Sequence, residues 1–526
     1  MQTSRSAVCF LAFVFFFISF SASVFANNLT ISNVRMGTRD PSAKTLSILF
    51  DLAWDNSWKN KINHDAAWIT LRLSDGQSST SEKVLCKLTT AGVSPAGFSA
   101  GSNQNAEIYV PQDKVGAFIR PSGHQPVSSF SSKNVTFVVD YSGCGFSDAT
   151  QIAVNVMGIE MVFVPQGSFY AGDFAASTGA FQRGSADTNP WEISGVGPIS
   201  VTAVTNNGFF YSSSGNIGEF ATGASFVIPQ DFPTGFNAFY AMKYELMEGQ
   251  WVDFINSLPA VNRAAHDLTD SNHKNTDSVL NRNTIACSGS PLTCATQRPS
   301  RAVSYLGWRD LCAFLDWAGL RPLTELEFEK AARGPFVPVA GEYAWGSTAI
   351  SPVTQLSGTE EKGNELATTQ DANAHFSNQT LTGGDASNGL EYTKGPLRAG
   401  IFSTGTSTRL SSGAGNYGMM ELSGDLKEWT VSVGNAKSLA FTGRNGDGFL
   451  TTLAGYSGNA DVDGWPGMDT VPAKGITSSS GAGFRGGSWQ DISDRLRISD
   501  RSEAAKGADD AQPSYGGRGA RTVDGQ

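Results

Sequence analysis

Cysteine side chains are the residues of this sequence best suited to hold a soft metal or to cross-link the chain, and six are present. Cys9 lies in an apolar leader, which leaves five cysteines in the mature chain. Cys287 and Cys294 flank the short segment SGSPLT, where a local disulfide would hold a loop in place. Cys86 and Cys144 could form a second bridge, and two free pairs are the alternative that the sequence leaves open.

Imidazole groups could also carry metal chemistry, but the five histidines are dispersed: His64, His124, His266, His273 and His375. A non-haem iron centre needs three imidazoles, or two with a carboxylate. His266 and His273 flank DLTDSN in a segment that we predict to be an exposed loop, so we expect solvated rings. Cys312 lies among apolar residues at helical spacing and is predicted to be buried and unreactive.

A polar run near the C-terminus has a composition suited to recognition. Between Gln490 and Arg501, acidic and guanidinium side chains alternate, and Trp489 comes directly before them. Tryptophan and arginine are frequent anchors of binding interfaces. We therefore predict a binding surface here, and internal Arg–Asp pairing that only holds the loops together is the alternative.

The N-terminus has the pattern of an export signal. Arg5 precedes an apolar run from Ala7 to Phe20, which is too short to span a bilayer with stable flanks. Val24 and Ala26 fit the rule for cleavage before Asn27. We expect residues 1–26 to be removed, which leaves no membrane span and a protein that is secreted, periplasmic or on the cell surface. An uncleaved anchor is the alternative.

Composition indicates an ordered globular protein rich in loops. Apolar residues make up 40% of the chain and charged residues 16%, and 58 glycines favour turns over helical bundles. The formal net charge is −10 and the basic residues are scattered, so the sequence offers phosphates no basic stripe. Nucleic acid is therefore not an expected partner.

The first 130 or so mature residues alternate apolar and polar side chains with the period of β-strands. The clearest runs are SILFDLAW (47–54), AAWITLRL (66–73), VTFVVDY (135–141) and QIAVNV (151–156). They predict an antiparallel β-sandwich domain over residues 27–156. No strand carries a cluster of carboxylates or histidines, so we expect adhesion, spacing or display rather than chemistry.

Helical patterns begin only after this region. Apolar residues recur at three and four positions from Leu246 to Leu258 and again from Trp308 to Trp317, which predicts two amphipathic helices. Thr324 and Glu327 form the sequence pattern of a capping box and predict a third helix in LEFEKAARG. The rest, from about residue 334 onward, is predicted to be loops and short strands.

Six segments in this order resemble the formylglycine-generating enzyme, or sulfatase-modifying factor, superfamily. They are MVFVPQGSFYAGD, FYAMKYELMEGQWVDFIN, VSYLGWRDLCAFLDWAGLRPLTELEFEKAARG, EYAWGS, NYGMMELSGDLKEWT and FRGGSWQDISDRLRISDR. The resemblance spans about residues 158–523 and implies an α+β, C-type-lectin-like domain over residues 157–526. It also implies that Arg497 and Arg501 are mainly structural.

The resemblance further implies a test of the chemistry. Catalytic relatives hold copper with two thiolates close to the segment that begins here at Gly486, and soft sulfur ligands select Cu(I). This segment contains Ser488 but no cysteine, and Lys427 replaces a tryptophan of the relatives. We therefore predict no catalytic residues and expect neither copper nor iron.

Calcium is the metal that the resemblance does imply. The family builds one site from positions that correspond to the side chains of Glu421 and Glu428 and the carbonyls of Gly424 and Leu426. The alternative is a salt-bridged surface turn at the same place. A second site would use Asn373 and the carbonyl of Ala374, completed by Asp385 or Glu391.

These expectations combine into an exported, non-catalytic binding or structural protein. Its ligand would be a peptide, a glycan or a cell-surface protein, bound at a groove formed by Ser488, Trp489, Gln490, Asp491, Asp494, Arg495 and Lys427. Two other functions stay open: a metal-dependent oxidase of the formylglycine-generating or non-haem iron sulfoxide synthase type, and a structural subunit of a surface layer or filament.

Overall fold

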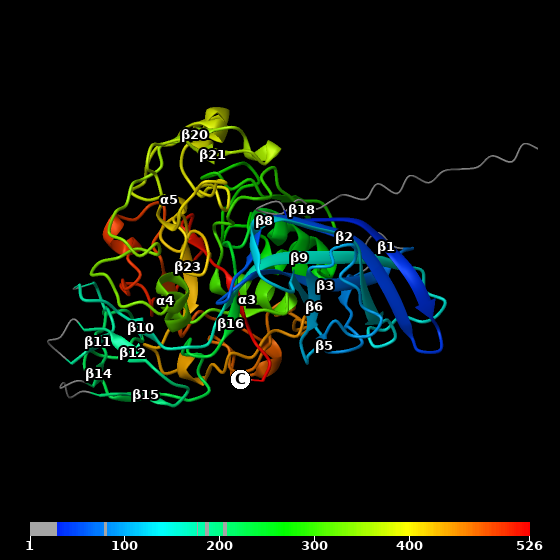
Figure 1. Ribbon diagram of the computed structural model, residues 1–526, viewed down its shortest axis with the longest axis horizontal. Coiled ribbons are helices and arrows are strands. Elements are labelled where there is room, and N and C mark those ends of the chain that lie inside the picture. Colours follow the sequence, from blue (N-terminus) through cyan, green and yellow to red (C-terminus); the bar gives the residue numbers. More distant parts are fainter. Residues whose placement is uncertain (1–28, 78–81, 176, 185–188, 203–207, 526) are drawn as a thin grey trace, which may run out of the picture.

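The computed structural model describes residues 29–77, 82–175, 177–184, 189–202 and 208–525. The predicted signal segment lies outside these residues. Figure 1 shows the N-terminal strands gathered at one end of the molecule and the loops of the remaining chain at the other. No helix of the described residues is both long enough and apolar enough to cross a membrane.

The N-terminal end contains a three-stranded antiparallel sheet in the order β1-β2-β8. Its strands are β1 (Thr30–Asp40), β2 (Thr45–Lys59) and β8 (Gln125–Asp140). Every second side chain of β2 from Leu46 to Trp54 is buried, as the period-two pattern predicts. One face of this sheet therefore covers a core.

A nine-stranded sheet forms the centre of the protein. Its main path has the order β19-β26-β16-β9-β3-β7-β6-β5, with β4 paired to β3. The strands are β3 (Asp65–Asp75), β4 (Val84–Leu85), β5 (Gly92–Val93), β6 (Ala106–Val110), β7 (Ala117–Pro121), β9 (Ile152–Val164), β16 (Phe239–Met242), β19 (Arg321–Pro322) and β26 (Gly519–Thr522).

Strand β9 links the N-terminal strands to the rest of the molecule. It pairs with β3 from Ile152 to Val162 and with β16 from Met161 to Val164. The domain boundary that we predicted after residue 156 therefore falls inside a strand, and the two parts of the chain share one continuous sheet (Figure 1).

Side chains of the two sheets meet in a common hydrophobic core. Ile48 and Phe50 of β2 lie in the same buried cluster as Ile69 and Leu71 of β3 and Phe137 of β8. A disulfide between Cys86 and Cys144 joins segments at the margin of this cluster. Burying these apolar side chains supplies the main favourable free energy of this part of the fold.

Helices α1 (Glu248–Ser257) and α3 (Trp308–Trp317) pack together beside the central sheet. The Phe254 ring contacts Phe314 and Trp317 edge-on, with centroid distances of 5.8 and 5.3 Å. Trp68 of β3 donates a hydrogen bond to the carbonyl of Ala318 at the end of α3. Both helices begin and end close to the positions that the sequence predicts.

Helix α4 (Glu325–Arg333) begins with the capping box that the sequence predicts. The Glu327 N–H donates to Thr324 Oγ1 at 3.1 Å, and the Thr324 N–H donates to the Glu327 carboxylate at 3.1 Å. These two bonds satisfy backbone donors that the helix itself cannot pair. The two remaining α-helices are short: α2 (Ala260–Arg263) and α5 (Arg409–Ser412).

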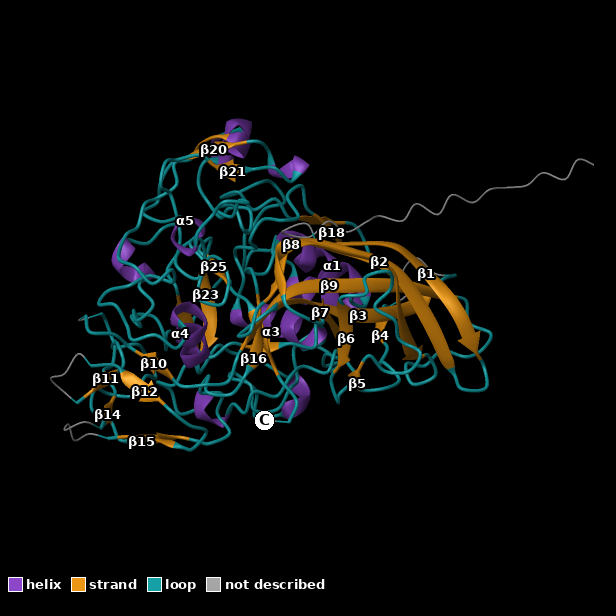
Figure 2. Ribbon diagram, in the orientation of Figure 1, coloured by secondary structure: helices purple, strands orange, loops and turns teal. Residues whose placement is uncertain are grey.

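Loops with small sheets make up most of the C-terminal two-thirds (Figure 2). The class is mixed α+β, with many strands and few helices, as predicted. The short strands are β10 (Phe169–Ala171), β11 (Gln182–Arg183), β12 (Trp191–Ile193), β13 (Ile199–Val201), β14 (Phe209–Phe210), β15 (Phe226–Ile228), β17 (Ala286–Ser288), β18 (Thr293–Ala295), β20 (Gln355–Ser357), β21 (Leu366–Ala367), β22 (Thr382–Gly383), β23 (Lys427–Val431), β24 (Ala482–Arg485) and β25 (Tyr515–Gly516).

Candidate functional site

The predicted binding residues lie around a tight turn directly after β24. Ser488 donates its hydroxyl and its N–H to the Asp491 carboxylate, at 2.6 and 2.9 Å. Lys427, on the neighbouring strand β23, places its ammonium 3.4 Å from the same carboxylate and 2.6 Å from Glu503. The turn is therefore held by its own hydrogen bonds and by an internal cation.

Three of the predicted contact residues, Ser488, Trp489 and Lys427, are buried, which corrects our expectation of them. Trp489 is only 1% exposed, and its indole N–H donates to the carbonyl of Pro513. The Lys427 side chain is enclosed and engaged with Glu503 and Asp491. None of the three can anchor a ligand in this arrangement, because the protein already covers them.

Three predicted residues do lie at the surface: Gln490, Asp494 and Arg495. The Arg495 side chain is 43% exposed and its guanidinium lies 3.7 Å from Asp500. Arg497 pairs with Asp494 at 2.8 Å. What the chain presents here is a small patch of exposed polar groups, partly paired with one another, and not a deep groove with an aromatic anchor.

Arg501 does not belong to this patch, because it is buried under α4. Its guanidinium donates to the Glu325 carboxylate at 2.6 and 2.9 Å. Arg485 donates to Glu325 at 2.9 Å and to Glu329 at 2.6 Å. These pairs fix the acidic face of α4 against β24 and the C-terminal loops, so Arg501 has the structural role that the sequence implied.

The first predicted calcium site contains an internal cation. Arg518 is fully buried and donates to both carboxylate oxygens of Glu428, at 2.5 and 2.7 Å. Glu421 accepts an N–H from Gly400 at 2.9 Å through Oε1, and its Oε2 has no hydrogen-bond partner in the described structure. A guanidinium therefore faces the carboxylate that the prediction assigned to calcium.

Carboxylates around Arg518 repel one another. Burial and the charge of Asp425 raise the pKa of Glu421 to about 8. Burial and the same neighbour raise the pKa of Glu245, whose Oε1 accepts the N–H of Leu426. A raised pKa favours the neutral acid, which removes negative charge from the cluster and lessens the repulsion. Of the two carboxylates in the predicted ligand set, Glu428 is already paired with Arg518, and Glu421 keeps one oxygen without a hydrogen-bond partner in the described structure.

The second predicted calcium set is also engaged in protein hydrogen bonds. The Asn373 side chain accepts from Ser351 N, at 3.0 Å, and donates to the carbonyl of Ala349. The carbonyl of Ala374 accepts from Val353 N at 3.0 Å. Both groups hold loops together, and neither points to a free ligand position.

Asp385, one of the two residues proposed to complete that set, belongs to a different buried group. Oxygens of Glu360, Glu365 and Asp385 lie within 4.8 Å of one another. Three guanidinium groups face them: Arg282 lies 3.0 Å from Glu365, Arg301 lies 2.7 Å from Glu360, and Arg298 lies 2.5 Å from Asp385. Each carboxylate of this group therefore has a guanidinium beside it. The other residue, Glu391, is exposed, and its carbonyl accepts the N–H of Arg282.

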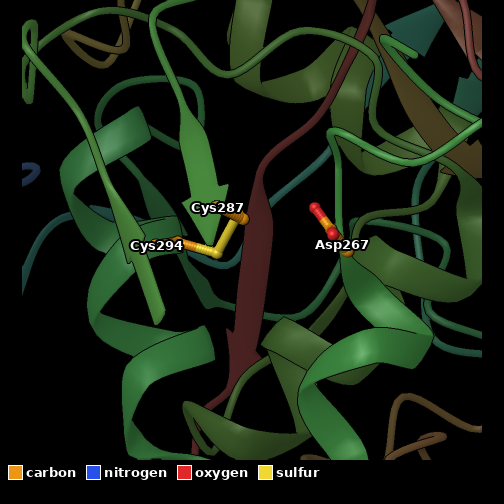
Figure 3. A group of neighbouring side chains, drawn as sticks. All are labelled: Asp267, Cys287 and Cys294. Atoms are coloured by element: carbon orange, nitrogen blue, oxygen red, sulfur yellow. A yellow bond between two sulfur atoms is a disulfide. The ribbon is translucent and has the colours of Figure 1, made fainter. Parts of the chain in front are cut away.

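In the described part of the chain, four cysteines form disulfides and the fifth is buried. Cys287 and Cys294 are directly opposite on the hairpin β17–β18 and form a disulfide of 2.04 Å. Figure 3 shows Asp267 beside this bond, but sulfurs joined to each other are not thiolate ligands. Cys312 is the one free cysteine among the described residues, and burial raises the pKa of its thiol far above the ordinary value.

Histidines 266 and 273 were predicted to be solvated, and the structure shows this to be wrong. His266 is fully buried, with Nδ1 2.8 Å from Asp310 Oδ1 and Nε2 2.8 Å from the carbonyl of Gly458. His273 lies between Asp310 Oδ2 at 3.0 Å and Asp270 Oδ1 at 2.7 Å. The sequence analysis did not connect these histidines with Asp310, because this residue lies at the start of α3, much later in the chain.

This His–Asp cluster carries charge but has no open ligand position. Burial opposes a charged ring at His273, but Asp310 and Asp270 outweigh it and raise its pKa to about 9. All four ring nitrogens of His266 and His273 lie within hydrogen-bond distance of protein oxygens, so none of them faces an open ligand position. The two imidazoles and a carboxylate are therefore adjacent without forming an iron site.

Comparison with known proteins identifies the C-terminal part of the chain. A family model described as "Sulfatase-modifying factor enzyme 1-like domain" matches residues 146–523. The chain is 40% identical over 57 residues to the "Formylglycine-generating enzyme" of Thermomonospora curvata, and 48% identical over 52 residues to that of Streptomyces coelicolor. These matches cover 11% and 10% of this chain and only 18% and 16% of the two relatives.

Among solved structures, the "Major Tropism Determinant U1 Variant" matches over 82% of this chain and 84% of its own. The identity is 12% and the TM-score is 0.22.

Proposed function

This chain belongs to the sulfatase-modifying factor enzyme 1-like family, and on that premise we propose that it is a non-catalytic member. In this proposal it is an exported binding or structural protein. Its family domain recognises a peptide, a glycan or a surface partner. The N-terminal strands act as a β-sandwich that spaces or displays the domain.

The state of the thiols carries the proposal. A copper centre of two thiolates requires two free, ionisable cysteines close together. In the described part of the chain, four cysteines are in disulfides and Cys312 is buried, with a raised thiol pKa. Ser488 and Lys427, near the position of the relatives' chemistry, are hydrogen-bonded inside the protein and offer no soft ligand.

Two disulfides support export, because such bonds persist in oxidising compartments. They fit a secreted, periplasmic or cell-surface address and agree with the predicted signal segment. For the ligand contact itself, the exposed side chains of Gln490, Asp494 and Arg495 are the members of the predicted set that a partner can reach.

An oxidase is the second candidate, because two relatives carry the name formylglycine-generating enzyme. The test is to load the purified mature chain with copper(I), and separately with iron(II), and to supply oxygen and a cysteine-containing peptide. We expect no aldehyde on the peptide and no oxygen consumption above the free metal. Metal analysis should find neither ion in stoichiometric amount.

A matched variant, Cys312→Ala, controls for the one free thiol of the described chain and should behave like the unaltered protein. Stoichiometric copper or iron accompanied by oxygen uptake would overturn the non-catalytic assignment. If that activity disappeared in Cys312→Ala, this cysteine would be its source.

A further inference from the structure

A cavity of about 590 Å³ opens close to the C-terminal end of the chain marked in Figure 1. The segment between β15 and β16 forms much of its wall, and the start of α4 and the last residues of the described chain complete it. Its volume is in the range of cavities that bind small molecules. It is separate from the turn at Ser488, none of whose residues lines it.

The buried charges of this cavity are already matched. Arg321 donates to both oxygens of Glu327, at 2.9 and 2.7 Å, and its Nε donates to Thr522 Oγ1 at 2.7 Å. Both ions are almost fully buried. Asp231 is the remaining charged residue of the lining, and it is exposed to solvent, where an ion contributes little to binding.

Neutral polar side chains provide the rest of the binding capacity. Gln166, Gln230 and Asn237 contribute amides and Thr442 contributes a hydroxyl. Within the described structure these four side chains make no hydrogen bond to the protein; Gln166, Gln230 and Thr442 are exposed to solvent and Asn237 is half-buried. Each amide offers two N–H donors and one carbonyl acceptor, and the hydroxyl can donate and accept.

The chemistry of the lining selects the class of ligand. An apolar ligand would cover the amides without giving them partners, which is unfavourable. An anion would find no free cation, because Arg321 is engaged with Glu327. A molecule that carries many neutral groups able both to donate and to accept hydrogen bonds satisfies the amides and needs no counter-ion.

An extended peptide fits this wall less well. Peptides that add to a sheet need a strand edge with free N–H and C=O groups. The edge strand that reaches the cavity is β19, which has two residues, and one of them, Pro322, has no N–H.

We propose that this cavity binds a neutral oligosaccharide through Gln166, Gln230, Asn237 and Thr442. The proposal rests on the proposed binding function and adds to it a second location with its own ligand class. It differs from the patch at Gln490, Asp494 and Arg495, whose exposed groups are partly charged.

Calorimetric titration of the mature chain with maltose, cellobiose, lactose and diacetylchitobiose tests this. We expect saturable binding of at least one of the four. Asn237→Leu and Gln166→Leu should each weaken it about tenfold, because each removes hydrogen bonds to the sugar. Gln370→Leu, which removes an exposed amide outside both the cavity and the predicted binding set, should leave the affinity unchanged, and thermal melting checks that every variant is folded.

Binding of none of the four sugars would overturn the proposal, as would an equal loss in Gln370→Leu. Tighter binding of a peptide, or of an acidic sugar such as glucuronate, would also overturn it. The sugar titration and the oxidase assay test different claims. If no sugar binds and no aldehyde forms, only the cavity proposal is wrong. If aldehyde forms, the non-catalytic assignment is wrong, and the titration still decides whether the cavity binds a sugar.

Discussion

Two groups of buried charges in this protein are balanced in different ways. Under α4, Arg485 and Arg501 face Glu325, and Arg485 also reaches Glu329, so nearly every carboxylate oxygen has a guanidinium partner. Around Arg518, four carboxylates share one guanidinium, and only one of them, Glu428, is paired with it.

The difference shows what each group can do. Paired ions under α4 hold the helix in place, and removing one partner would leave a buried charge without a counter-ion. Unbalanced carboxylates near Arg518 relieve their repulsion by holding protons, as the raised pKa of Glu421 indicates. The first group should therefore respond to mutation, and the second to pH.

Breaking the paired group should have the largest effect. Arg485→Met leaves Glu325 and Glu329 short of a partner and should lower the free energy of unfolding by about 3–5 kcal/mol, measured by urea denaturation. Arg495→Met, an exposed arginine on the same segment, should change it by less than about 0.5 kcal/mol. Similar losses in both variants would contradict the comparison.

Titration of the unbalanced group comes second. The pKa of Glu421 is raised from 4.5 to about 8, so between these pH values the folded protein holds a proton that the unfolded chain releases. Stability from this group is fully present below pH 4.5 and is lost as pH rises toward 8, by at most about 1.4 kcal/mol per pH unit.

Glu421→Gln keeps the shape of the side chain and removes the charge, so it should flatten this slope in denaturation curves taken at several pH values. Glu192→Gln, at an exposed position of β12, serves as the control and should leave the slope as it is. A slope that persists in Glu421→Gln would place the titrating group elsewhere.

His273 provides a further test of how stability depends on pH, over a narrower pH range than Glu421. Its pKa is raised from 6.5 to about 9 by Asp310 and Asp270. Stability from the charged ring is present below pH 6.5 and is lost as pH rises through 9. His273→Gln should therefore reduce the loss of stability between pH 6.5 and 9, and His124→Gln, an exposed histidine, should not. An unchanged profile in His273→Gln would mean that the ring is neutral.

Calcium should produce the smallest effect. Because Arg518 already faces Glu428, about 5 mM calcium should leave the melting temperature of the mature chain unchanged, and a chelator should do the same. Stabilisation that rises with calcium concentration would show that the Arg518 group accepts a metal after all.

Local patterns predicted much of the secondary structure. Helix α3 covers the predicted residues 308–317, and the Thr324 and Glu327 capping box begins α4. Such features depend on neighbours three or four positions apart, which a sequence displays directly. Strand β9 was predicted too short, because its second half pairs with β16, a strand more than 70 residues later.

The candidate site could be predicted only in part. The sequence places Gln490, Asp494 and Arg495 on a loop, and they are exposed. It could not show that Trp489 is covered, because the group that accepts its indole N–H, the carbonyl of Pro513, belongs to a later segment. The Arg518 pair with Glu428 was missed for the same reason: the two residues are 90 positions apart.

The sequence by itself determined the chemical inventory: how few thiols and imidazoles are available, the period of the strands, the caps of the helices, and the motifs of the family. Only the tertiary structure decided which charged groups meet, which residues are covered, and where a cavity opens. The physical reason is that the energy of a buried ion depends on its partners and on its removal from water, and both are set by segments far apart in the chain.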